Sequence, residues 1–185
     1  MLLLLSGLLI RVFRARGHYR EMSRQDRLSG LANHAWFFER AEEILESVNS
    51  SREKVFLILG DIDHFKAIND RFGHLMGDQV LGQIARRLKE SFGDDALIGR
   101  IGGEEFGILV CDWELEAVIE GVERFQTETR TKVREGDPVV TLSFGIAEVQ
   151  YGDSLTDLRK RADAALYRAK DTGRDRYVID TRGVH

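Results

Sequence analysis

Residues 100–109 constrain the fold of this chain most, because two glycines and two acids lie there between apolar residues. The segment reads Arg-Ile-Gly-Gly-Glu-Glu-Phe-Gly-Ile-Leu, which is typical of a β-hairpin. Adjacent glycines supply the positive backbone dihedrals of a tight two-residue turn, and they allow the phosphates of a ligand to approach the backbone. Glu104 and Glu105 would lie at the hairpin tip and favour a cation. The alternative for this segment alone is an ordinary turn with solvated acids.

A second constellation begins with the apolar run at residues 55–59, which reads Val-Phe-Leu-Ile-Leu and is typical of a strand buried on both faces. The polar residues that follow this run, or lie near its end, are Asp61, Asp63, Lys66, Asn69 and Asp70. Magnesium is usually held by one or two carboxylates plus substrate phosphates, so Asp61 and Glu104 on neighbouring strands would suffice for a magnesium-bound polyphosphate. The alternative is a solvated junction between a strand and a loop.

Length and composition fit one compact domain. The chain has 185 residues, of which 43% are hydrophobic, enough for one core of ordinary size. Residues 1–30 carry a net charge of +4, which leaves −8 on residues 31–185. Such an acidic body argues against nucleic acid as a partner. The single cysteine, Cys111, ends an apolar run, so we expect a small buried side chain and a reducing, cytoplasmic compartment.

The amino terminus differs from the rest, because an apolar run at residues 1–10 precedes a cluster of arginines. The arginines are Arg11, Arg14, Arg16 and Arg20. The apolar run is shorter than the about 20 residues that span a bilayer, and a secretory signal would carry its charge before the run. We therefore expect residues 1–25 to form an apolar and basic helix. It is either membrane-proximal, in association with the inner membrane, or dimerising as a coiled-coil connector.

Hydrophobic periodicity predicts the remaining elements. Helices are expected after Asn33, from near Asp78, over residues 113–130, and after Ser154 up to Gly173. Strands are expected at residues 55–59, 96–100, 105–110, 139–147 and 177–179. Asn33 and Ser154 are suited to helix N-caps. Helices that alternate with hairpin-linked strands indicate an α+β fold, in which helices cover one mainly antiparallel central sheet.

Five ordered blocks of this sequence resemble the GGDEF domain of diguanylate cyclases, in the variant whose signature reads Gly-Gly-Glu-Glu-Phe. The blocks are residues 26–33, 61–78, 102–106, 140–147 and 162–174. The resemblance covers nearly the whole chain. It implies a catalytic domain over residues 26–180, followed by a tail of residues 181–185. It also implies a nucleotidyl-cyclase-like fold with a ferredoxin-like core.

The resemblance implies roles in binding a metal and a guanine base. Asp61, the carbonyl of Ile62 and Glu104 would hold magnesium (Mg2+) on the triphosphate. Asn69 and Asp78 would read the guanine edge, since a carboxylate accepts from the N1 and N2 donors and an amide serves either polarity. His74 would line the nucleotide pocket. The remaining substrate-binding positions implied by the resemblance are Phe65, Gly102, Gly103 and Glu105.

The catalytic roles that the resemblance implies fall on Glu104 and Lys66. Glu104 would help to deprotonate the attacking 3′-hydroxyl, with metal activation of that hydroxyl doing most of this work. Lys66 would neutralise charge that develops on the phosphates, and Lys170 and Arg174 would hold the terminal phosphates. Read without the family, Lys170 and Arg174 could complement a helix dipole, and Asn69 could cap a turn.

The reaction implied is the condensation of two GTP molecules to cyclic di-GMP, with release of two pyrophosphates. One domain would hold one GTP, so a homodimer with a two-fold axis would bring two domains head to head. Two alternatives remain: a catalytically silent GTP-binding regulatory module, and a cyclic di-GMP receptor. Many family members carry an Arg-x-x-Asp product-inhibition site at positions that here hold Gly93 and Ala96. We therefore expect product feedback by that route to be weak or missing.

Overall fold

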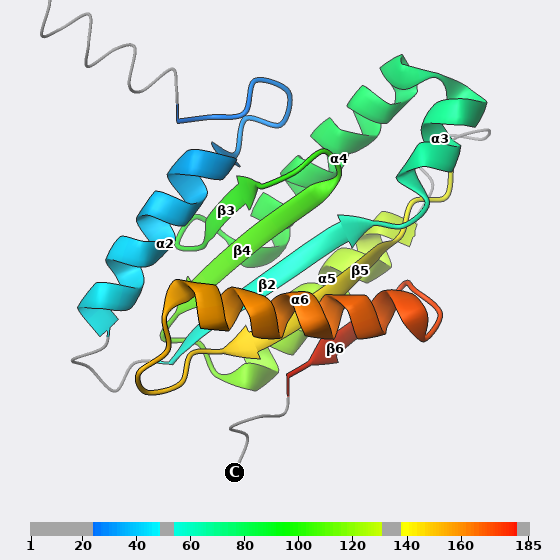
Figure 1. Ribbon diagram of the computed structural model, residues 1–185. Coiled ribbons are helices and arrows are strands. Elements are labelled where there is room, and N and C mark those ends of the chain that lie inside the picture. Colours follow the sequence, from blue (N-terminus) through cyan, green and yellow to red (C-terminus); the bar gives the residue numbers. More distant parts are fainter. Residues whose placement is uncertain (1–23, 49–53, 131–137, 181–185) are drawn as a thin grey trace, which may run out of the picture.

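One mixed sheet lies between two layers of helices in the computed structural model, which describes residues 24–48, 54–130 and 138–180 (Figure 1). The helices are α2 (His34–Val48), α3 (Phe65–Phe72), α4 (His74–Phe92), α5 (Leu115–Arg130) and α6 (Leu155–Asp171). The strands are β1 (Ala32–Asn33), β2 (Val55–Ile62), β3 (Leu97–Arg100), β4 (Glu105–Cys111), β5 (Leu142–Glu148) and β6 (Tyr177–Ile179).

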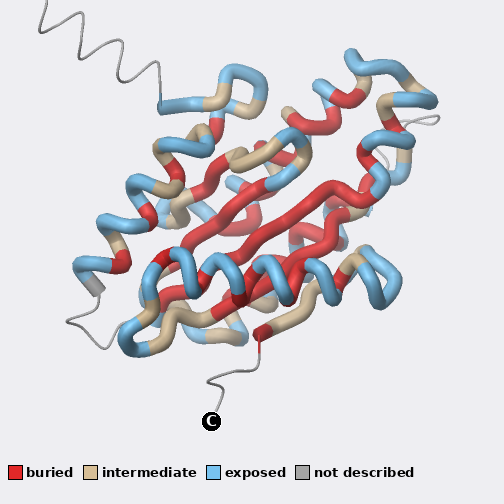
Figure 2. Tube along the Cα trace, in the orientation of Figure 1, coloured by how far each residue is buried: buried red, intermediate tan, exposed pale blue. Residues whose placement is uncertain are grey.

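The strand order in the sheet is β1-β3-β4-β2-β5-β6, which places β2 between β4 and β5. β2 is antiparallel to both neighbours, and β3 is antiparallel to β4. The two outermost pairs, β1 with β3 and β5 with β6, are parallel. All eight residues of β2 are buried, as its continuous apolar run predicts (Figure 2). The expected α+β fold with a mainly antiparallel sheet is confirmed.

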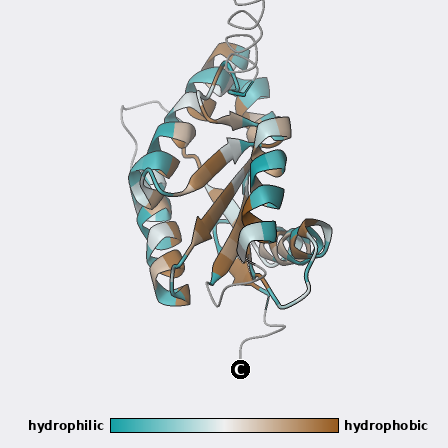
Figure 3. Cartoon of the chain, turned by 90° about the vertical axis from the view of Figure 1, so that its left-hand side faces the viewer, coloured by the Kyte–Doolittle hydropathy of each residue, from teal (hydrophilic) through white to brown (hydrophobic). Residues whose placement is uncertain are grey.

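Side chains of β2 alternate between two hydrophobic cores. Phe56 and Ile58 pack into the core formed with α3, α4 and α5, whereas Leu57 and Leu59 pack into the core formed with α2 and α6. Figure 3 shows this pattern as apolar strands between helices with hydrophilic outer surfaces. Because side chains alternate along a strand, Asp61 shares its face with Leu57 and Leu59. The carboxylate of Asp61 therefore lies on the same side of the sheet as α6.

Both expected helix caps are confirmed. The Asn33 side chain accepts a hydrogen bond from the backbone N–H of Trp36 at 3.0 Å, one residue before α2 begins. Ser154 precedes α6, and its hydroxyl accepts from the N–H of Asp157 at 3.2 Å. These caps fix where the two helices on one face of the sheet begin.

Several element boundaries differ from the prediction. The helix α3 was not expected, because its eight residues make only about two helical turns. α4 begins at His74 rather than near Asp78, directly after Gly73, whose φ of 83° ends α3. β5 begins at Leu142 rather than at residue 139. Cys111 is half-buried rather than buried, at the end of β4.

The expectations for residues 1–23 and for the tail, residues 181–185, lie outside the described residues. The membrane-proximal or dimerising amino-terminal helix therefore stays a prediction. Among the helices that the structure describes, none combines the length and apolar character needed to cross a membrane.

Candidate active site

The candidate site lies where β2 ends beside the tip of the β3–β4 hairpin. In the sheet register, Asp61 pairs with Glu105 of β4 on one side and with Ser143 of β5 on the other. The N–H of Ile62 donates a hydrogen bond to the carbonyl of Glu104 at 3.2 Å. Asp61 is 7% exposed, at the end of the buried strand. The sheet therefore brings together two carboxylate-bearing segments more than 40 residues apart in the chain.

The two glycines of the hairpin do not form the expected two-residue turn. β3 ends at Arg100 and β4 begins at Glu105, so residues 101–104 make a four-residue connection. Neither Gly102 nor Gly103 has a φ in the left-handed region. A Cβ on Gly102 would lie 2.2 Å from a carboxylate oxygen of Glu105. The missing side chain at this position therefore leaves room for Glu105, and the expected positive backbone dihedrals were wrong.

The carboxyls of Asp61 and Glu104 are held in surroundings that disfavour their ionisation. Burial raises the pKa of Asp61, and the nearby charges of Glu105 and Asp63 add to this effect. The hydrogen bond and charge of Lys170 act in the opposite direction without reversing the shift. Burial also raises the pKa of Glu104, and the charge of Asp61 raises it further. A cation between these carboxylates would stabilise both in their charged forms.

Lys170 supplies one such cation from the last turn of α6. Its Nζ lies 2.8 Å from Oδ2 of Asp61, with the lysine side chain one-third exposed. The charge of the same ammonium group partly offsets the raised pKa of Glu104. The contact requires α6 to run along the sheet face onto which Asp61 projects, as the strand alternation dictates. The structure thus joins three of the predicted site residues, Asp61, Glu104 and Lys170.

A second group of predicted residues lies where α3 meets α4. A Cβ on Gly77 would lie 2.0 Å from Oδ1 of Asn69 and 3.2 Å from the ring of Phe65. The Asn69 side chain of α3 therefore rests on the backbone of α4, next to the residue that precedes Asp78. Phe65 is 8% exposed and belongs to the core, so its ring packs between the core and the contact of α3 with α4.

The remaining predicted side chains are exposed. Lys66 of α3, His74 and Asp78 of α4, and Arg174 after α6 make no hydrogen bond or ion pair through their side chains with the described residues. They surround the end of the sheet at which β2 terminates, because α3 follows β2 after only two residues. Their roles stay predictions.

The sequence did not indicate a link between the β3–β4 hairpin and the turn that contains Asp26 and Ser29. The Arg100 guanidinium donates to the carbonyl of Gly103 at 2.7 Å and to the carboxylate of Asp26 at 3.2 Å. Asp26 also accepts from the N–H and hydroxyl of Ser29 at 2.8 and 2.7 Å. Asp26 and Ser29 both belong to a block that carries the family resemblance, but nothing in their spacing indicates Arg100 as a partner.

A second missed feature is the carboxylate of Asp63, which is 5% exposed. Its oxygens accept hydrogen bonds from the hydroxyls of Thr141 and Ser143, each at 2.7 Å. Two hydroxyl side chains in an otherwise apolar stretch were the available signal, since buried hydroxyls need partners.

The donor set fits a divalent cation that keeps phosphate ligands. Within residues 24–48, 54–130 and 138–180, no cluster of three or more histidine, cysteine or acidic side chains could hold a metal. Asp61 and Glu104 instead provide two carboxylates beside a glycine-containing loop. This is the class of site in which a metal bridges one or two carboxylates and a polyphosphate.

Sequence comparison identifies the family. The family described as "Diguanylate cyclase, GGDEF domain" matches residues 23–176, and this chain belongs to it. The chain is 40% identical over 162 residues to diguanylate cyclase VdcA of Vibrio cholerae, covering 83% of this chain and 46% of that protein. It is 39% identical over 163 residues to diguanylate cyclase DgcP of Pseudomonas aeruginosa, covering 86% of this chain and 24% of that protein. The chain thus spans less than half of each relative.

Solved structures share the fold. The coiled coil and GGDEF domain of DgcB from Caulobacter crescentus, in complex with c-di-GMP, matches with a TM-score of 0.84 and 30% identity, covering 95% of this chain and 96% of that one. The active GGEEF domain of a diguanylate cyclase from Vibrio cholerae matches with a TM-score of 0.77 and 32% identity, covering 81% and 97%. The expected nucleotidyl-cyclase-like fold is confirmed. Family membership implies a divalent metal.

Proposed function

We propose that this chain is a diguanylate cyclase domain that condenses two GTP molecules to cyclic di-GMP and releases two pyrophosphates. The observation that carries the proposal is the meeting of Asp61, Glu104 and Lys170 at the end of β2, in a chain of the GGDEF family. Two carboxylates and an ammonium group suit a metal-bound triphosphate better than a purely structural role, because burial disfavours the carboxylates as they stand.

Magnesium is the metal proposed for this site. Asp61, Glu104 and the carbonyl of Ile62 would hold it, since magnesium prefers oxygen ligands and keeps substrate phosphates in its shell. When bound, it would neutralise phosphate charge and favour the ionised form of the attacking 3′-hydroxyl. Glu104 would help to accept the proton of that hydroxyl, while activation of the hydroxyl by the metal would do most of this work, because a metal-bound carboxylate is a weak base.

The corner between α3 and α4 would bind the guanine. Asn69 and Asp78 present an amide and a carboxylate, which match the acceptor and donor groups of the guanine edge. The support for this role is the packing of Asn69 against Gly77, which fixes the amide next to the residue that precedes Asp78. Phe65 and His74 would line the same pocket, and Gly102, Gly103 and Glu105 would face the phosphates.

Three cations would hold the phosphates. Lys170 already lies on Asp61, while Lys66 and Arg174 are exposed and able to turn toward a ligand. Lys66 would stabilise charge that develops during the reaction, and Lys170 and Arg174 would hold the terminal phosphates. Arginine and lysine are both suited to this role, arginine through two parallel hydrogen bonds.

Each domain would supply one GTP, so catalysis requires two copies facing each other across a two-fold axis. Each 3′-oxygen would then attack the α-phosphate of the other nucleotide. Residues 1–25 would either bring two copies together or place the domain at the inner face of the membrane. In support of the first option, one structural relative comprises a coiled coil and a GGDEF domain.

The test is product formation at several protein concentrations. The full chain is incubated with GTP and magnesium, and the nucleotides are separated chromatographically. The proposal predicts cyclic di-GMP whose rate of formation rises more steeply than the protein concentration, because two domains meet in each turnover. GTP binding without product at any concentration, including after fusion to a dimeric coiled coil, would instead identify a silent GTP-binding regulatory module.

A further inference from the structure

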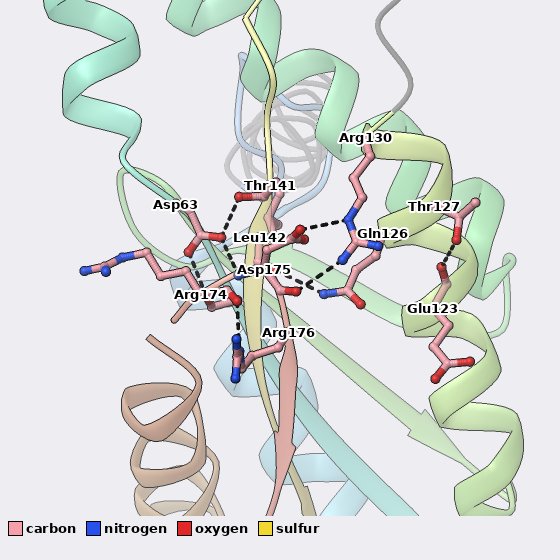
Figure 4. A network of polar contacts seen from close by, with 11 residues as sticks. Asp63, Glu123, Gln126, Thr127, Arg130, Thr141, Leu142, Arg174, Asp175 and Arg176 are labelled. Carbon is pink, nitrogen blue, oxygen red and sulfur yellow. Dashed lines mark hydrogen bonds and ion pairs between the residues drawn. The ribbon is translucent and has the colours of Figure 1, made fainter. Parts of the chain in front are cut away.

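The carboxylate of Asp63 connects the end of β2 to the turn that follows α6. Besides the hydroxyls of Thr141 and Ser143, it accepts a hydrogen bond from the backbone N–H of Asp175 at 3.0 Å. This last bond joins residues 112 positions apart in the chain. The N–H belongs to the peptide group between Arg174 and Asp175, so Asp63 holds the backbone on the carboxyl side of Arg174 (Figure 4).

That turn has an uncommon backbone conformation. Arg174 and Asp175 have φ values of 62° and 48°, so two successive residues with side chains occupy the left-handed region. Such residues persist where surrounding contacts fix them, because the conformation is unfavourable by itself. A second support is Arg130 of α5, whose guanidinium donates to the carboxylate of Asp175 at 2.8 Å and to its carbonyl at 3.2 Å. The turn is therefore held from two elements.

The side chain of Arg174 is left out of this network. Figure 4 shows its guanidinium pointing away from Asp63 and from Asp175. Its backbone, by contrast, is fixed on both sides, since its N–H donates to the carbonyl of Ala169 at 3.0 Å and its carbonyl accepts from Arg176 at 2.9 Å. An exposed cation on a fixed backbone is pre-organised for a ligand, because binding then costs only side-chain ordering.

We propose that Asp63 is a positioning residue, which holds the Arg174–Asp175 peptide so that Arg174 reaches the terminal phosphates of the bound nucleotide. The inference rests on the proposed function, because it uses Arg174 as a phosphate ligand. It assigns to Asp63 a role separate from that of Asp61. The Asp61 side chain would hold the metal, whereas Asp63 faces the hydroxyls of Thr141 and Ser143 and the turn after α6.

The test measures how strongly the full chain distinguishes a triphosphate from a monophosphate. The ratio of affinities for 3′-deoxy-GTP, which cannot be cyclised, and GMP is measured by calorimetry with magnesium present. Asp63→Ala is expected to lower this ratio about tenfold, the effect of losing one charge-assisted hydrogen bond to phosphate. Arg174→Ala should lower it by a similar factor, and the double variant should lose little more than either single one.

Matched variants separate positioning from general damage. Thr141→Val removes one hydrogen bond from the same carboxylate oxygen but spares the bond to Asp175, so it should keep the ratio. Asp63→Asn should also keep it, because the amide oxygen can accept from Asp175 while the amide nitrogen donates to Ser143. If Asp63→Ala does not fold, Asp63→Glu replaces it. That variant keeps the charge but displaces the carboxylate by one methylene, and the same fall in ratio is expected.

Amide hydrogen exchange gives a readout that is independent of nucleotide. The N–H of Asp175 should lose its protection in Asp63→Ala and keep it in Thr141→Val. A wild-type chain that binds 3′-deoxy-GTP no more tightly than GMP would overturn the proposed function and this inference together. A wild-type chain that does discriminate, with the ratio unchanged in Asp63→Ala or with additive losses in the double variant, would overturn the positioning role alone.

Discussion

Lys170 Nζ lies 2.8 Å from Oδ2 of Asp61, so the last turn of α6 places a cation on the buried carboxylate at the end of β2. The contact depends on two features of the fold. Strand alternation directs Asp61 to the face covered by α6, and the cap at Ser154 sets where α6 begins. A charge pair in this position keeps a carboxylate available for a metal despite its burial.

Removing this cation should change how metal binding depends on pH. Burial raises the pKa of both Asp61 and Glu104, and Lys170 partly offsets this rise, so Lys170→Met should raise both pKa values further. Because the metal needs the ionised carboxylates, the pH below which magnesium binding is lost should move upward. Calorimetric titration with magnesium over a series of pH values measures this shift. Lys160→Met, on an exposed position of the same helix, is the control, and an identical pH dependence in Lys170→Met would contradict the assignment.

Asp61 should also lower the stability of the metal-free fold. Burial raises its pKa in the folded chain, so the folded state keeps a proton that the unfolded state has already released. The associated stability is present below the ordinary pKa of aspartate and is lost as pH rises through the raised value. Asp61→Asn should therefore melt at a higher temperature than wild type at neutral pH, with the difference closing in acid. Thermal unfolding without metal tests this, and a lower melting temperature at neutral pH would argue against it.

The link from Arg100 to Gly103 and Asp26 should support both stability and turnover. Arg100→Ala removes hydrogen bonds to a carboxylate and to a carbonyl of the signature loop. We expect a loss of about 1–3 kcal/mol in the free energy of unfolding and a decrease in kcat of about tenfold, because Gly103 adjoins the base. Arg40→Ala, which breaks the exposed pair with Glu43, is the control. It should change the free energy of unfolding by no more than about 0.5 kcal/mol and should leave kcat unchanged.

The same link has an acid dependence of opposite sign to that of Asp61. Burial of Asp26 acts to raise its pKa, but hydrogen bonds from Ser29 and Arg100 outweigh it and lower the pKa. Its contribution to stability is present above the ordinary pKa of aspartate and is lost as pH falls through the lowered value. Acid unfolding should therefore separate wild type from Arg100→Ala less at low pH than at neutral pH. A constant difference would contradict this account.

Cyclic di-GMP should not inhibit this chain through the turn after α4. Gly93 caps α4 with a φ of 76°, a conformation that favours glycine over the arginine of the family's inhibitory site. Residue 96 is an alanine that packs partly against the core, and it has no carboxylate with which to bind the product. Initial rates with added cyclic di-GMP measure the effect. Non-competitive inhibition that disappears in Asp94→Ala would show that this turn binds product after all.

The sequence predicted those elements whose signal is local. β2 was recognisable from five consecutive apolar residues, and Asn33 and Ser154 marked two helix starts because a cap acts within three residues. α3 was missed since its eight residues make only about two turns, too short a stretch for periodicity to indicate a helix. The predicted two-residue turn was wrong. The pairing of β4 with β2, rather than the two glycines, determines that β4 begins at Glu105.

The candidate site was predictable only in part. Asp61 and Glu104 were expected from their places on neighbouring strands, Lys170 was expected from the family resemblance, and the structure brings the three together. The role of Arg100 depends on a hydrogen bond to Asp26, which lies 74 positions away in the chain. The role of Asp63 depends on a hydrogen bond from Asp175, which lies 112 positions away. No spacing rule relates such residues, because the partner of a buried carboxylate is set by the packing of the whole sheet.

If Asp61 and Glu104 hold the metal of a cyclase, turnover should depend on magnesium and on both carboxylates. Cyclic di-GMP formed from GTP is measured for wild type, Glu104→Gln and Glu90→Gln, an exposed control on α4. We expect magnesium-dependent product from wild type and from Glu90→Gln. In Glu104→Gln we expect the rate of product formation to fall by about 100-fold or more at every magnesium concentration. A Glu104→Gln variant that keeps the wild-type rate and magnesium dependence would contradict this role of Glu104.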